Sequence, residues 1–156
     1  MKKLLMIGGV VVVIFAALIF VTSYQNEQAA QGNPFGLDSL HQETIDQLDN
    51  PLYENIILPE ELDSRLDEDG SAMVYFYSGQ CQYCNETTPV IVPLAEDMNV
   101  DLELYNILEF DQGWDDYGIE GTPTVIYFEN GEEADRISGM YGKETYEAFF
   151  EQAANE

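Results

Sequence analysis

The chemistry of this sequence centres on its two cysteines, which stand in the order Cys81-Gln82-Tyr83-Cys84. Two thiols at this spacing can form a reversible disulfide: one thiolate attacks a target, and the other releases the mixed disulfide that results. A bridge across two residues closes too small a loop to constrain the unfolded chain much, so stability alone does not explain the pair. We therefore predict a thiol-disulfide exchange site at Cys81 and Cys84.

Cysteines at this spacing also occur in metal sites. Zinc needs two further ligands, and the chain contains a single histidine, His41, which lies far upstream in a predicted surface helix. Copper can be held by two thiolates alone or with a methionine sulfur, so a copper-binding module is the alternative reading of the pair. We expect no zinc, no other metal and no further cofactor.

The elements around the cysteines predict how the two sulfurs are placed. Residues 72–78 form an almost continuous apolar and aromatic run, which is typical of a central strand covered on both faces. Apolar residues then recur at helical spacing from Val90 to Met98. The cysteines thus occupy a turn from a strand into a helix, where unpaired amides stabilise a thiolate. Cys81 is the predicted attacking residue, and Cys84, one turn deeper, is its resolving partner.

The flanking segments extend this pattern into an α/β domain with a partly parallel sheet. Helices are predicted from Pro59 to Gly70, after the cysteines, and near the C-terminus around Tyr146 and Phe150. Asn130-Gly131 is a strong hairpin signal between the last two strands. The predicted strands cover residues 55–58, 72–78, 101–107, 124–128 and 134–139.

The N-terminal residues differ from the rest of the chain. Leu4 to Val21 is a run of 18 residues without a charged or strongly polar side chain, just long enough to span a membrane as a helix. Lys2 and Lys3 precede the run and no positive charge follows it until Arg65, so the positive-inside rule places the following domain outside the cytoplasm. A cleaved signal peptide is the alternative, although no Ala-x-Ala site is present.

These signals divide the chain into three parts. Residues 1–23 are the predicted single-pass membrane anchor. Residues 24–50 are a tether and a short helix, because the segment from Thr22 to Gly36 lacks apolar periodicity and an amphipathic pattern runs from Asp38 to Asn50-Pro51. Residues 51–156 form the exchange domain.

The net charge limits the class of partner. The formal charge is −25, from 30 acidic and 5 basic residues. Such a chain repels phosphate backbones and anionic lipid headgroups, which excludes nucleic-acid binding. The acidity fits a surface kept soluble in a salty or alkaline medium.

From Asn55 to the C-terminus, about two-thirds of the chain, the sequence resembles the thioredoxin superfamily. The strand before the cysteines, Pro89 in the following helix, and the run Tyr117–Thr124 all match the pattern of that family. The resemblance implies a thioredoxin-like α/β fold, with a central mixed sheet flanked by helices. It also implies a cis peptide bond at Pro123, opposite the cysteines, and a Thr122 backbone that pairs with an extended substrate. Further candidate substrate contacts are Gln82, Tyr83 and Tyr77.

Three departures from the family pattern bear on the chemistry. Gln80 replaces a tryptophan, Gln82-Tyr83 replaces a Gly-Pro pair, and Tyr75 replaces a buried acid in the preceding strand. The usual aid for deprotonating Cys84 is therefore missing, and the redox direction stays open.

Within the superfamily, three features together resemble exported bacterial thiol-disulfide oxidoreductases, including bacteriocin-transport accessory proteins. They are the N-terminal anchor, Tyr83 before the second cysteine, and Thr122 before the cis-proline. The expected function is thiol-disulfide exchange on exported proteins, from the outer side of the cell membrane and with a membrane redox partner. A copper-binding module and a non-catalytic accessory protein of a secretion apparatus are the alternatives.

Overall fold

The computed structural model describes residues 2–68 and 70–153, with side chains from Ile7 onward. The chain divides into two compact units, Met1–Ile45 and Asp46–Glu156. The first unit contains the helices α1 and α2, and the second contains the sheet and the cysteines.

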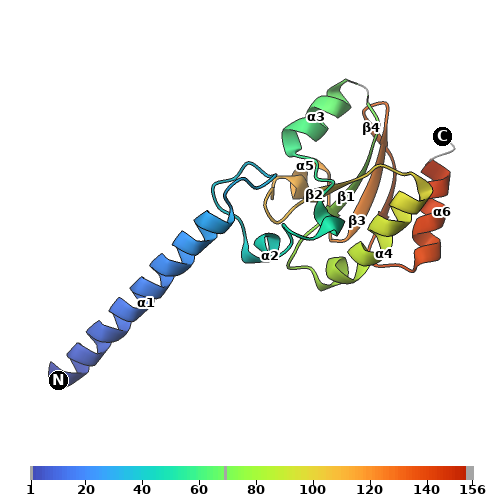
Figure 1. The fold of residues 1–156 in the computed structure, drawn as a ribbon. Helices are drawn as coiled ribbons and strands as arrows, with labels where there is room; N and C mark the ends of the chain where they lie inside the picture. The colour runs from blue at the N-terminus through green and yellow to red at the C-terminus, as the bar shows by residue number, and fades with distance from the viewer. Residues whose placement is uncertain (1, 69, 154–156) are drawn as a thin grey trace. The chain divides into compact units, whose positions relative to one another are not determined.

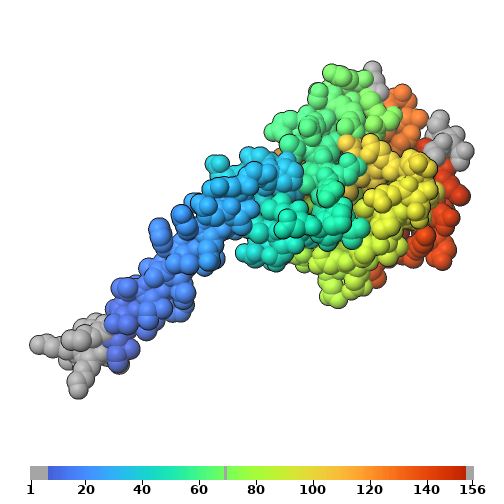
Figure 2. Space-filling model, in the orientation of Figure 1, coloured from blue at the N-terminus to red at the C-terminus, as the bar shows by residue number. Residues whose placement is uncertain are grey.

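Helix α1 (Lys2–Ala29) forms most of the first unit. Its stretch Ile7–Ala29 is long and apolar enough to cross a membrane, with a mean hydropathy of 2.4, and none of that window is buried within the protein. The large apolar side chains of this helix from Ile7 to Val21 are exposed, and Figure 2 shows the helix in space-filling form. The helix continues past Thr22 into the predicted tether. Gln, Glu and Ala propagate a helix that the apolar run has already nucleated, and no glycine or proline stands between Thr22 and Gly32.

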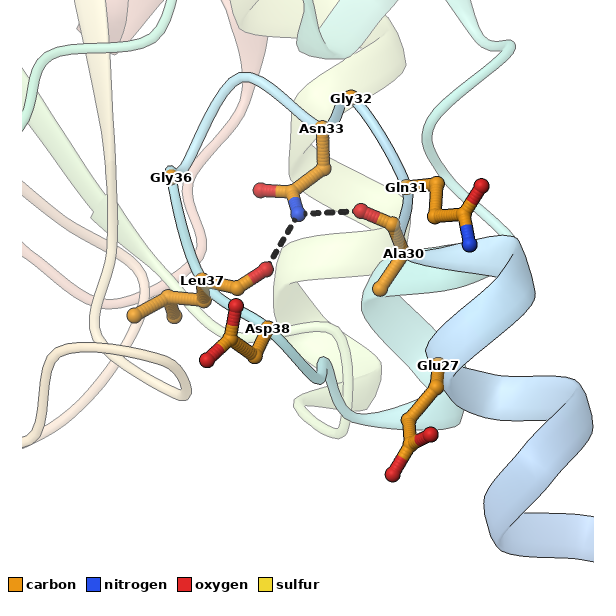
Figure 3. Close-up of a pocket in the computed structure, with 8 residues that line it drawn as sticks. All are labelled: Glu27, Ala30, Gln31, Gly32, Asn33, Gly36, Leu37 and Asp38. Atoms are coloured by element: carbon orange, nitrogen blue, oxygen red, sulfur yellow. Dashed lines mark hydrogen bonds between the residues drawn. The ribbon is translucent and has the colours of Figure 1, made fainter.

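The segment after α1 is a hydrogen-bonded loop rather than an open tether. Gly32 has a φ of 74°, which ends the helical path. The Asn33 side-chain amide donates to the Ala30 carbonyl at 2.6 Å and to the Leu37 carbonyl at 2.7 Å, as Figure 3 shows. The segment predicted as a tether thus contains the end of α1 and a hydrogen-bonded loop, and its flexibility stays a prediction.

The short helix predicted from Asp38 is also smaller than expected. Helix α2 covers only Gln42–Ile45, and a 3₁₀ turn, η1, covers Pro51–Tyr53. The side chain of Asn50 accepts the Leu52 amide at 3.1 Å and so caps η1. An asparagine that bonds the backbone two residues ahead favours a turn over a continued helix.

The sheet of the second unit has the order β2-β1-β3-β4. Its strands are β1 (Ala72–Tyr77), β2 (Leu102–Asn106), β3 (Thr124–Glu129) and β4 (Glu132–Ser138). β1 runs parallel to β2 and antiparallel to β3, and β3 is antiparallel to β4. Asn130 and Gly131 join β3 to β4 with φ values of 52° and 79°, the conformation of a tight hairpin turn.

Helices cover both faces of this sheet (Figure 1). α4 (Gln82–Met98) and α6 (Lys143–Ala153) lie on one face, and α3 (Pro59–Asp67) and α5 (Gly113–Asp116) lie on the other. Alternate residues of β1 supply the two cores: Tyr75 and Tyr77 pack with α4 and α6, while Val74 and Phe76 pack with Leu62 of α3. The predicted mixed sheet flanked by helices is confirmed.

The strand predicted at residues 55–58 forms only an isolated parallel bridge between Ile56 and Leu104. Ile57 N donates to Leu104 O, and Leu104 N donates to Asn55 O, so the backbone reaches β2 as a strand would. Leu58 is already the N-cap of α3, with its amide bonded to the Glu61 carboxylate at 3.1 Å. The helix begins before a strand can extend.

Candidate redox site

Cys81 lies just beyond the end of β1, at the first turn of α4. It is the N-cap of that helix, with φ −83° and ψ 113°, and its Sγ accepts the Cys84 amide at 3.1 Å. The cap position brings the sulfur next to amides that have no partner within the helix. The sulfur is partly exposed and both thiols are free. A thiolate at Cys81 is thus stabilised by a backbone donor and open to attack a target.

Cys84 is buried behind Cys81. Its exposed fraction is 0%, and it belongs to the core cluster that includes Tyr75 and Tyr77. Burial, and to a lesser extent the hydrogen bond and charge of Cys81, raise the pKa of the Cys84 thiol well above its ordinary value. Cys84 therefore stays protonated near neutrality and can act on a mixed disulfide only after giving up its proton.

The cis-proline segment meets the cysteines from the far end of the chain. The Thr122–Pro123 peptide bond is cis, as the resemblance implied. The Cys81 thiol donates to the Thr122 carbonyl at 3.3 Å, across 41 positions of sequence. The fold thus brings Cys81, Cys84, Thr122 and Pro123 together.

The remaining predicted contacts divide between surface and core. Tyr83 is 59% exposed, and the exposed Gln82 donates to Glu86 at 3.1 Å, so both lie on the surface beside Cys81. Tyr77 is only 1% exposed, and its ring lies 5.3 Å from that of Tyr53 in the core. Tyr77 is therefore part of the core around Cys84 and not part of the surface beside Cys81. Side chains alternate between the two faces of β1, so Tyr77 lies on the same face as Tyr75.

A hydroxyl network that the sequence did not reveal lies next to Cys84. Thr88 Oγ1 donates to the Cys84 carbonyl at 2.8 Å, and the Tyr75 hydroxyl lies 3.2 Å from Thr88 Oγ1. Because Thr88 uses its proton on Cys84, Tyr75 is the donor in their bond. Burial, and then the charge of Cys84, raise the pKa of Tyr75 well above its ordinary value, so this hydroxyl is a donor and not a base. The position of Thr88, four residues after Cys84 in a helix, was the available signal.

Among the described residues, no group of three or more His, Cys, Asp or Glu side chains is arranged to hold a metal ion. Copper binding would thus depend on the two thiolates without a third ligand of these types within the described part of the chain. The arrangement is instead suited to exchange between sulfurs.

Comparisons with known proteins lead to the same chemistry. The sequence matches the Thioredoxin family model over residues 55–152, which include both cysteines and Pro123. It is 34% identical over 89 residues to the chloroplastic thioredoxin M4 of Arabidopsis thaliana, covering 56% of this chain and 46% of that protein. It is 32% identical over 90 residues to a thioredoxin of Chlamydia pneumoniae, covering 57% and 87%. A mutant thioredoxin from Halobacterium salinarum NRC-1 is similar in structure, with a TM-score of 0.54 and 25% identity over 63% of this chain and 87% of that one.

Proposed function

The chain belongs to the thioredoxin family, and on this premise we propose that it exchanges thiols and disulfides with exported proteins while anchored in the cell membrane. A thioredoxin-family redox function with Cys81 and Cys84 follows from the family itself. One observation supports the division of roles: Cys81 lies partly exposed at the N-cap of α4, in front of the fully buried Cys84.

The exchange proceeds in two balanced steps. The Cys81 thiolate attacks one sulfur of a substrate disulfide, which forms a mixed disulfide and releases the other substrate sulfur as a thiolate that takes up a proton. Cys84 then loses its proton and attacks Cys81, which releases the second substrate thiol and leaves a Cys81–Cys84 disulfide. The substrate is reduced and the chain oxidised; the reverse sequence oxidises the substrate and reduces the chain.

The membrane setting is supported by the N-terminal unit. An apolar helix covers Ile7–Ala29, and the sequence places Lys2 and Lys3 before it and no other cation until Arg65. Under the positive-inside rule this charge distribution favours a cytoplasmic N-terminus and an external redox domain. The substrates would then be exported proteins, and a second membrane protein would restore the redox state of the cysteines.

Trapping in the native membrane tests the proposal. In Cys84→Ser, Cys81 still attacks but the thiol that releases the substrate is gone, so mixed disulfides with exported proteins should accumulate and disappear on reduction. Cys81→Ser is the matched control and should trap nothing. If Cys84→Ser yields no mixed disulfides while its partners are present, the exchange proposal fails and the non-catalytic accessory role gains support.

Location is tested separately. In intact cells the redox domain should be accessible to added protease and should stay in the membrane fraction after a carbonate wash. A soluble form beginning near Tyr24 would show cleavage of the N-terminal segment instead. Protection of the domain from protease in intact cells would contradict the external placement.

The reduction potential of the Cys81/Cys84 pair decides the direction of exchange. A value near about −270 mV would make the chain a reductant, and one near about −120 mV an oxidant. The same reduced protein, challenged with Cu(I) and a strong chelator, tests the copper alternative. Stoichiometric copper that survives the competition would favour a copper-binding module.

A further inference from the structure

Arg136 on β4 binds the beginning of the segment that carries the cis-proline. Its Nη1 donates to the Gly118 carbonyl and its Nη2 to the Tyr117 carbonyl, each at 3.0 Å. These carbonyls follow the end of α5 at Asp116 and so need partners from outside the helix. The Glu133 carboxylate accepts from the same guanidinium and fixes its orientation.

The end of the same segment is bonded independently. Thr124 Oγ1 donates to the Gly121 carbonyl at 2.8 Å, and the Gly139 amide donates to the Pro123 carbonyl at 2.7 Å. Carbonyls on either side of Thr122 are thus bonded to β3 and to the end of β4, while the Thr122 carbonyl itself accepts from Cys81. Thr124 at the start of β3 and Gly139 just after β4 thus hold the backbone on both sides of Thr122.

We propose that Arg136 is a positioning residue for the redox site, which holds residues 117–123 so that the Thr122 backbone faces Cys81 and an extended substrate. The inference rests on the proposed exchange function. Arginine suits the task because its planar fork can donate to two carbonyls and a carboxylate at once, whereas a lysine ammonium cannot reproduce that geometry.

The partial exposure of this contact indicates a local role. The side chains of Arg136 and Glu133 are 32% and 35% accessible, so their ion pair adds little to global stability. Loss of the guanidinium should therefore loosen the segment without unfolding the domain. Substrate docking would suffer, while the partly exposed Cys81 sulfur would keep its bond from the Cys84 amide and still react with small reagents.

The test compares the full-length Arg136→Gln variant with the wild-type chain in detergent, using a disulfide-bonded peptide as substrate. We expect KM to rise about tenfold with kcat within about twofold, because binding is lost rather than chemistry. Alkylation of Cys81 by iodoacetamide should change by less than about twofold, and amide hydrogen exchange of residues 117–122 should speed up about tenfold. Arg136→Lys should recover part of the KM effect.

Arg65→Gln is the matched control, since it also removes one charge and one Arg–Glu ion pair, the one with Glu103 on β2. It should leave both KM and the amide exchange of residues 117–122 unchanged. Thr124→Val removes the independent bond to Gly121 and should also raise KM, whereas Thr124→Ser keeps the hydroxyl and should not.

The role of Arg136 is overturned if Arg136→Gln leaves KM and loop exchange unchanged, or if Arg65→Gln changes them as much. Failure of the wild-type chain to react with any disulfide would defeat the proposed function instead. The hydrogen-exchange comparison between the two arginine variants would still decide whether Arg136 holds the segment.

Discussion

Cys81 and Cys84 are three positions apart in the chain, yet backbone groups at the surface surround the first and aromatic side chains in the core surround the second. The Cys81 sulfur contacts the Cys84 amide and the Thr122 carbonyl. The Cys84 side chain shares a cluster with Tyr75 and Tyr77. The surroundings of the attacking sulfur thus depend on where the fold places main-chain atoms. The surroundings of the resolving sulfur depend on which side chains pack against it. Substitutions around the two should therefore have different kinds of effect.

The largest expected difference is in reactivity. In the reduced full-length chain, Cys81 should be alkylated by iodoacetamide at least about a hundredfold faster than Cys84, because Cys81 is accessible to the reagent while Cys84 is buried with a raised pKa. Mass spectrometry of the labelled chain over time measures both rates. In guanidinium chloride the two rates should converge, and equal rates in the native chain would remove the basis of the comparison.

The next effect concerns pH. Because burial raises the pKa of Cys84 in the folded state, the folded chain holds this proton more tightly than the unfolded chain does. The resulting stability is fully present below the unfolded pKa of about 8.5 and is lost as the pH rises toward the folded value.

Relative to Cys84→Ser, the reduced wild-type chain should lose about 1.4 kcal/mol of unfolding free energy per pH unit between about pH 9 and 10.5. Denaturant titrations at several pH values measure this slope. The tyrosines with raised pKa values are present in both chains and largely cancel. Parallel curves for the two chains would show that Cys84 is not held as a thiol.

Two tyrosine substitutions test which hydroxyl groups stabilise the core around Cys84. Tyr75→Phe removes the bond to Thr88 and should lower the unfolding free energy of the reduced chain by about 1 kcal/mol. The buried Tyr77 hydroxyl makes no hydrogen bond of normal geometry among the described residues and has only a weaker contact with the Asn106 side chain, so Tyr77→Phe should lower stability by less than about 0.5 kcal/mol. Chemical denaturation measures both, and equal losses would contradict the assigned network.

The smallest effect on stability and on substrate binding is expected at the surface beside Cys81. Tyr83 is 59% exposed, so Tyr83→Ala should leave the unfolding free energy within about 0.5 kcal/mol of the wild-type value. It should raise KM for a peptide disulfide about twofold to threefold, since an exposed ring contributes modestly to contact. Gln82→Ala, at the neighbouring candidate contact, is measured in the same assay. A stability loss of several kcal/mol would show that Tyr83 is part of the core.

Local patterns in the sequence predicted most of the fold around the cysteines. The continuous apolar run predicted β1, and Asn130-Gly131 predicted the hairpin. The cis bond before Pro123 came from family resemblance and is confirmed. These features depend on a few neighbouring residues, so a single sequence is enough to find them.

The features that the sequence did not reveal depend on distant partners. Tyr77 lies in a strand covered on both faces, and a continuous apolar run does not say which side chains line the surface. Arg136 binds the carbonyls of Gly118 and Tyr117, which lie 18 and 19 positions away. Every residue type has a backbone carbonyl, so the sequence does not show which of them accepts a hydrogen bond from Arg136. The full length of α1 was not predicted for a different, local reason. Apolar periodicity does not detect a polar stretch of helix that continues an apolar one.

Strand β4 forms one edge of the described sheet, and its sequence carries Glu132, Glu133 and Asp135. An open strand edge can template pairing between molecules, and like charges along it oppose such pairing. These acidic side chains, of which Glu133 is paired with Arg136, therefore disfavour the addition of another strand at β4, which is the role that charged residues commonly have on an edge strand.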